Sequence, residues 1–194
     1  MGELHGEWKN CYTAGGKSYD CGFCGSSVGP SFYYSCQGSN GYEYGSIYLC
    51  PNCNKPTFFQ EGTGEQVPGS IFGEDIEHLP EDIDQLYSEA RKCLSVNAFT
   101  SAVLSCRKLL MNVSVSKGAD PGKSFVSYVT FLEENHFVPP GSNVWVDHIR
   151  KKGNEATHEI PSITRDDAIE LLEFTEMLLR FVYELPGKMA RHTT

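Results

Sequence analysis

The stretch CGFCGSSVGPSFYYSCQGSNGYEYGSIYLCPNC, residues 21–53, begins and ends with a Cys-x-x-Cys pair. The pieces SFYYSC and SIYLC inside it are strand-like, and Gly, Ser and Asn residues separate them. Each Cys-x-x-Cys makes a tight turn that directs two thiolates to one point, so a strand hairpin between two such turns brings four sulfurs together. The sequence therefore predicts a β-rich zinc-ribbon or knuckle module with one structural zinc ion. Its predicted ligands are Cys21, Cys24, Cys50 and Cys53.

Other interpretations of the cysteines are weaker or remain open. Disulfides are not favoured, because the first ten residues lack the basic segment and apolar core of a signal peptide. A redox pair is expected within a βαβ pattern, which neither motif has. Four sulfurs suit iron as well as zinc. A closed four-cysteine site has no open coordination position, so we expect a scaffolding role for the metal. Cys11 and Cys36 are interpreted as packing residues, or as reserve ligands if one pair is misassigned.

The same region is rich in aromatic residues. Such side chains can stack on bases of RNA, or they can pack within a hairpin. Packing is the favoured interpretation. The residues concerned are Phe32, Tyr33, Tyr34, Tyr42, Tyr44 and Tyr48.

Glycine becomes rare after residues 62–73, GTGEQVPGSIFG, and apolar residues then recur at helical spacing. The pattern predicts helices that begin near residue 80, at 97–118, at 123–136, near 143 and at 165–185. The chain is therefore predicted to be mainly α, with a five-helix bundle over residues 80–186. The predicted zinc-ribbon-like module covers residues 1–61, a linker 62–79 and a tail 187–194.

The segment IRKKGNEATH, residues 149–158, holds the densest basic cluster of the chain. Arg150, Asn154 and His158 follow at four-residue steps, which places them on one slanting face of a helix. In a phosphate site Arg150 would neutralise charge, His158 would act as general base or acid, and Asn154 would position the substrate. Alternatively, Gly153 and Asn154 end a helix with a basic last turn, and His158 ties the next loop to the bundle.

The order of these features resembles a known family. The segments are YSEARKCLSVNAFTSAVLSCRKLL (87–110), IRKKGNEATHE (149–159) and TRDDAIELLEFTEMLLRFVYELP (164–186). They resemble the bacterial domain of unknown function 4145 and, more widely, the HEPN group (higher eukaryotes and prokaryotes nucleotide-binding). The resemblance implies a HEPN-like bundle with an N-terminal zinc knuckle. Many HEPN proteins are metal-independent ribonucleases that work as dimers and combine the Arg and His of two copies. In this chain Arg150 and His158 are separated by more residues than is usual in that group. Arg107 matches the family's Arg, whereas Leu110 and Met111 stand where a Glu is often found.

Charge and hydropathy limit the partners. A net charge of −9 disfavours broad gripping of duplex DNA, and no apolar run is long enough to span a membrane. Besides the side that faces the bundle, the last predicted helix has a second apolar stripe with Phe174, Met177 and Phe181. We expect this stripe to pack against either the zinc module or a second chain, and we favour a homodimer.

Two functions are compatible with this sequence, and we expect a cytoplasmic protein in either case. One is binding of RNA or nucleotide phosphates, with metal-independent ribonuclease chemistry in a bacterial defence or toxin-like system. The alternative is a non-catalytic dimerisation or interaction module of a larger defence or restriction-type system with a protein partner.

Overall fold

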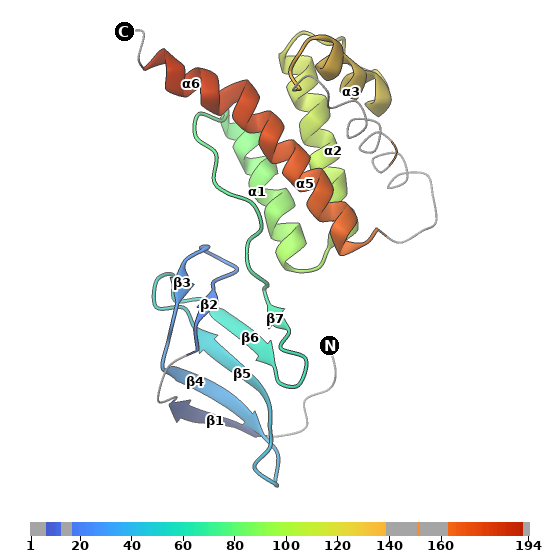
Figure 1. The fold of residues 1–194 in the computed structure, drawn as a ribbon. Helices are drawn as coiled ribbons and strands as arrows, with labels where there is room; N and C mark the ends of the chain where they lie inside the picture. The colour runs from blue at the N-terminus through green and yellow to red at the C-terminus, as the bar shows by residue number, and fades with distance from the viewer. Residues whose placement is uncertain (1–6, 13–16, 139–150, 152–162, 192–194) are drawn as a thin grey trace. The chain divides into compact units, whose positions relative to one another are not determined.

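A computed structural model describes residues 7–12, 17–138, 151 and 163–191. The chain forms two compact units, Met1–Ile71 and Phe72–Thr194 (Figure 1). We call them the N-terminal unit and the helical unit. Each is described separately below.

The N-terminal unit contains a five-stranded antiparallel sheet in the order β1-β4-β5-β6-β7. Its strands are β1 (Glu7–Tyr12), β4 (Phe32–Gln37), β5 (Glu43–Leu49), β6 (Pro56–Gln60) and β7 (Gln66–Val67). The short strands β2 (Tyr19–Asp20) and β3 (Ser27–Val28) pair with each other in a second sheet. Gly41 makes the turn between β4 and β5 possible, since its φ of 78° is strained for other residues.

The core of the N-terminal unit is small and aromatic. Tyr19, Tyr48 and Phe59 are buried together with Cys21 and Cys50. The rings of Tyr19 and Phe59 meet edge to face, with 5.1 Å between their centroids. Such contacts stabilise a core beyond the area that they bury. This core surrounds the two cysteine pairs.

The helical unit is built from α1 (Glu81–Ser95), α2 (Phe99–Ser116), α3 (Phe125–Glu134) and α5 (Arg165–Leu179). Beyond α5 the helix continues as the π-helix η1 (Arg180–Glu184) and then as α6 (Leu185–Ala190). Helices α1, α2 and α5 lie side by side (Figure 1). They bury one continuous core, whose largest fully buried side chains are Tyr87 and Phe174. Thr164 and Asp167 start α5 with a capping box, each accepting a hydrogen bond from the other's backbone N–H.

The predicted fold class is wrong. In the part of the chain that the structure describes there are four separate helices, the last of which continues through η1 and α6, and seven strands. The protein is therefore a mixed α and β structure and not a mainly α five-helix bundle. The β content was underestimated because β2, β3 and β7 are two residues long and lie in Gly- and Ser-rich segments that resemble turns. The helix predicted near residue 143 falls outside the described residues, apart from Lys151, which is helical and exposed.

The described helices were also compared with what a bilayer requires. None of them is both long enough and apolar enough to cross a membrane.

Candidate functional site

Two similar turns hold the four cysteines of the N-terminal unit. In the first, the carbonyl oxygen of Cys21 accepts a hydrogen bond of 2.8 Å from the N–H of Gly25. In the second, the carbonyl oxygen of Cys50 accepts one of the same length from Asn54. Gly25 and Asn54 both have a positive φ, at 70° and 58°, which Gly and Asn tolerate best. Each turn therefore bends the chain back so that both of its thiols point the same way.

The four sulfur atoms form a compact group. The Sγ atoms of Cys21 and Cys53 are 3.7 Å apart, and those of Cys24 and Cys50 are 3.8 Å apart. All four lie within 4.8 Å of one another. Sulfurs at the corners of a tetrahedron with Zn–S bonds of about 2.3 Å are about 3.8 Å apart. The group can hold a metal ion, and its size is consistent with zinc.

Hydrogen bonds to sulfur prepare the site for a metal. The N–H of Phe23 donates to the Sγ atom of Cys21 over 3.5 Å. The amide of Asn52 donates to the Sγ atom of Cys24 over 3.5 Å and to the hydroxyl of Ser26 over 2.9 Å. Bonds from Asn52 and Ser26 lower the pKa of the Cys24 thiol to about 6, whereas burial raises the pKa of Cys21. Because metals bind thiolates, donors to sulfur favour the binding form.

The surroundings of the four-sulfur group favour a structural role. Cys21 and Cys50 are fully buried, and Cys24 and Cys53 are half-buried. A metal bound by all four would have no free position for a substrate. It would instead complete the small core of the N-terminal unit.

The remaining cysteines of the N-terminal unit lie outside this group. Cys36 is buried in β4, and Cys11 lies half-buried in β1, where its sulfur accepts a bond of 3.7 Å from Gln37. Neither belongs to the four-sulfur group. Their positions in the sheet are consistent with the predicted packing role.

The residues predicted to act on phosphate, Arg150, Asn154 and His158, lie outside the described residues. Arg107, which the family resemblance also singled out, is half-buried in α2. Its guanidinium lies 4.5 Å from the centre of the Phe125 ring, and burial lowers its pKa.

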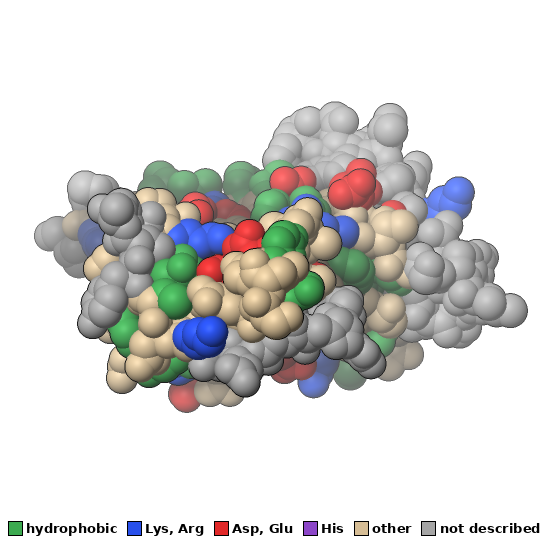
Figure 2. Space-filling view, turned by 90° about the horizontal axis from the view of Figure 1, so that it is seen from below, with side chains coloured by type: hydrophobic (Ala, Val, Ile, Leu, Met, Phe, Trp, Pro, Cys, Tyr) green, Lys and Arg blue, Asp and Glu red, His purple; other side chains and the backbone are tan. Residues whose placement is uncertain are grey.

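Basic and acidic side chains are interspersed on the face that Figure 2 shows. Among the described residues drawn there, Lys and Arg therefore form no continuous basic field of the kind that grips a nucleic-acid backbone.

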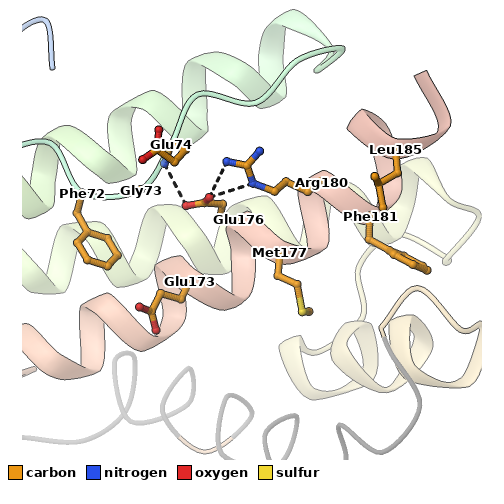
Figure 3. Close-up of a pocket in the computed structure, with 9 residues that line it drawn as sticks. All are labelled: Phe72, Gly73, Glu74, Glu173, Glu176, Met177, Arg180, Phe181 and Leu185. Atoms are coloured by element: carbon orange, nitrogen blue, oxygen red, sulfur yellow. Dashed lines mark hydrogen bonds and ion pairs between the residues drawn. The ribbon is translucent and has the colours of Figure 1, made fainter. Parts of the chain in front are cut away.

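Sequence reasoning missed a hollow of 580 Å³ in the helical unit (Figure 3). We call it the acidic hollow. It is lined by Phe72, Gly73, Glu74, Glu173, Glu176, Met177, Arg180, Phe181 and Leu185. The carboxylate of Glu176 accepts bonds from the Tyr87 hydroxyl at 3.1 Å, the Glu74 N–H at 3.2 Å and the Arg180 guanidinium at 2.8 Å. These partners come from three segments of the chain, so sequence spacing gave no signal for the hollow.

A second hollow of 500 Å³ shares Phe181 and Leu185 with the first. We call it the basic hollow, because Lys117 and His136 line it together with apolar side chains. The other lining residues are Asn135, Phe137, Val182, Pro186 and Met189.

An apolar stripe, which we define as Met177, Phe181, Leu185 and Met189, runs past both hollows. Met177 is half-buried, and the other three are 43 %, 49 % and 70 % exposed. Figure 3 shows Met177 and Phe181 on the side of the helix opposite to Glu176 and Arg180. Soluble monomers rarely leave a run of large apolar side chains in water.

Comparison with known proteins bears on the helical unit. No curated protein and no solved structure matches the chain. Residues 88–193, which are more than half of the chain, match a family described as a domain of unknown function, DUF4145. The matched segment starts inside α1 and includes the whole apolar stripe, whereas the four-sulfur group lies before it. The chain belongs to the DUF4145 family.

Proposed function

We propose that this protein is a non-catalytic interaction module that self-associates through its helical unit. The N-terminal unit is a scaffold that a structural zinc ion stabilises. In this proposal the protein acts in the cytoplasm, where free thiolates persist, as one part of a larger bacterial defence or restriction-type system.

The apolar stripe is the observation that carries this proposal. Phe181, Leu185 and Met189 expose between 43 % and 70 % of their surface on one continuous helix. Covering apolar surface is the main favourable contribution to protein association. A helix whose opposite side already packs in the core can offer such a surface without unfolding.

A sedimentation experiment tests the proposal. We expect a concentration-dependent dimer at micromolar concentration, and we expect Leu185→Ser to shift it to monomer. Val96→Ser is a matched control, because Val96 is 54 % exposed at the end of α1, far from the stripe in sequence. A monomer at all concentrations would contradict the proposal.

A second candidate is binding of RNA or nucleotide phosphates, with HEPN-like ribonuclease chemistry. Lys151 favours it, because this side chain is exposed on a helical residue within the basic cluster of residues 150–152. Local positive charge attracts phosphate even on an acidic protein. In this mechanism His158 takes the proton of a ribose 2′-hydroxyl, Arg150 stabilises charge on the phosphate, and no metal takes part.

Two variants separate this candidate from a purely structural motif. If the site cleaves RNA, Arg150→Ala and His158→Ala should each abolish cleavage and leave the melting temperature unchanged. Chelators should then not inhibit cleavage by the parent protein. If the motif is structural, the same variants lower the melting temperature and the parent protein cleaves no RNA.

A further inference from the structure

The helical unit begins with a segment that has no regular secondary structure and leads into α1. We call this segment, residues 72–79, the strap. Its first half is held in place by α1 and α5. The guanidinium of Arg91 donates to the carbonyl oxygens of the first two strap residues, over 3.0 and 2.6 Å. The backbone N–H of Glu74 donates to the carboxylate of Glu176 over 3.2 Å (Figure 3).

The second half of the strap lies against the end of the last helix. The side chain of Arg191, the residue after α6, donates to the carboxylate of Glu77 over 3.3 Å and to Nε2 of His78 over 2.8 Å. The side chains of Arg191 and Glu77 are 61 % and 56 % exposed, and an ion pair so open to water contributes little. Another contact has to hold this half of the strap on the helix.

That contact joins the ring of His78 to Gly187 in α6. A Cβ atom at position 187 would lie 2.5 Å from Cγ and 2.9 Å from Cβ of His78. These two atoms are close to the His78 backbone, so the ring could not turn away from a larger residue unless the strap moved. His78 has a positive φ of 63°, which histidine adopts more readily than most residues. Glycine at 187 is therefore what lets the strap approach the helix.

Helix α6 is weak on its own. It has six residues, and none of them is buried. Pro186 and Gly187 belong to the two residue types that disfavour a helix interior most. Isolated helices of this length do not persist in water. The contacts of α6 with the strap therefore matter for whether it stays folded.

We infer that the strap keeps α6 helical through His78 and so positions Leu185 and Met189, the two members of the apolar stripe that lie on α6. The strap follows directly on the N-terminal unit in the sequence. A partner or a change of state that draws His78 away from Gly187 would release α6 and disperse this part of the stripe. The role of the stripe in self-association rests on the proposed function, whereas the dependence of α6 on the strap does not.

Hydrogen exchange of the full chain, loaded with zinc, tests the contact. Helix propensity alone predicts that Gly187→Ala slows amide exchange in residues 185–190. The close approach of His78 predicts the opposite sign. We expect exchange there to become about tenfold faster or more, because overlap between packed atoms shifts a folding equilibrium by at least that factor. Slower or unchanged exchange in Gly187→Ala would overturn the inference.

A second variant removes the other side of the contact. His78→Gly deletes the ring, and glycine suits a φ of 63°. It should also speed exchange in α6. The double variant His78→Gly with Gly187→Ala should exchange more slowly than either single variant, because the overlap is gone and alanine favours the helix. Additive effects of the two changes would mean that the residues do not interact.

The matched control is Asn97→Gly. Asn97 has a similar φ of 60°, is exposed, and lies between α1 and α2. It should leave exchange in α6 unchanged, and an equal increase there would trace the effect of His78→Gly to general loosening of the chain.

Sedimentation of the same variants separates this inference from the proposed function. If the parent protein is a dimer, both single variants should weaken it and the double variant should recover it. A dimer whose single variants keep the exchange of the parent protein overturns the role of the strap and leaves self-association standing. A monomeric parent protein contradicts self-association, and the exchange measurements then decide on the strap alone.

Discussion

Replacing one buried cysteine should release the metal and unfold the N-terminal unit alone. Cys21 is fully buried and its sulfur lies 3.7 Å from that of Cys53. Structural zinc contributes about 10–16 kcal/mol of apparent binding free energy at neutral pH. If the four sulfurs share this equally, Cys21→Ser loses about 2.5–4 kcal/mol. The affinity for zinc should then fall by a factor of about a hundred to a thousand.

The effect should stop at the boundary between the units, because each unit has a core of its own. We expect the parent protein to show a thermal transition of the N-terminal unit that depends on zinc, and a second one of the helical unit that does not. Cys21→Ser should lose the first transition, lose zinc by elemental analysis, and keep the helical circular dichroism of the second.

Cys36→Ser is the control, because Cys36 is buried in the same unit at 1 % exposure but is not part of the four-sulfur group. It should lower the first transition through its effect on packing and still retain one zinc per chain. Freshly purified parent protein without zinc or iron, or equal metal loss in both variants, would refute the reasoning.

Three further predictions concern the helical unit. Phe174 is fully buried, so Phe174→Ala should lower the free energy of unfolding in urea by about 3–5 kcal/mol, and a loss below about 1 kcal/mol would contradict its place in the core. Tyr87→Phe removes the hydroxyl that donates to Glu176 and should cost about 1.5–3 kcal/mol in the same titration. Hydrogen bonds from Lys188 and Arg180 lower the pKa of the Glu184 carboxyl from 4.5 to about 2. The stabilisation that this ionised carboxylate gives the folded state is therefore complete above pH 4.5 and is lost as the pH falls towards 2. Glu184→Gln should flatten this part of the dependence of the melting temperature on pH, and an unchanged slope would count against the ion pairs.

The four-sulfur group was predictable because its geometry is local. Each Cys-x-x-Cys pair fixes its own turn, and only one hairpin, β4 with β5, lies between the two turns. The structure brings all four sulfurs together as the spacing predicted. The identity of the ion stays a prediction, since four thiolates suit zinc and iron alike.

Helix boundaries were less predictable where side chains can serve two purposes. The predicted second helix, 97–118, takes Asn97 as its N-terminal cap, and this start is wrong. Asn97 adopts a positive φ of 60° just after α1, and Ala98 is the N-cap of α2. Asn is favoured at N-caps and also tolerates the left-handed conformation, so its presence alone does not distinguish the start of one helix from the end of another.

The surface of the last helix shows why periodicity alone misplaces an interface. Phe174, Met177 and Phe181 were predicted to share a stripe away from the core, but Phe174 is fully buried between the helices. A regular α-helix was assumed to end near Leu185, whereas the chain passes into η1 and continues as α6 to Ala190. Phe174 lies on the regular part of α5, before η1, and shares the buried face of Leu171 and Leu178 at i−3 and i+4. Met189 joins the exposed stripe because η1 and α6 carry the helix beyond its predicted end at residue 185.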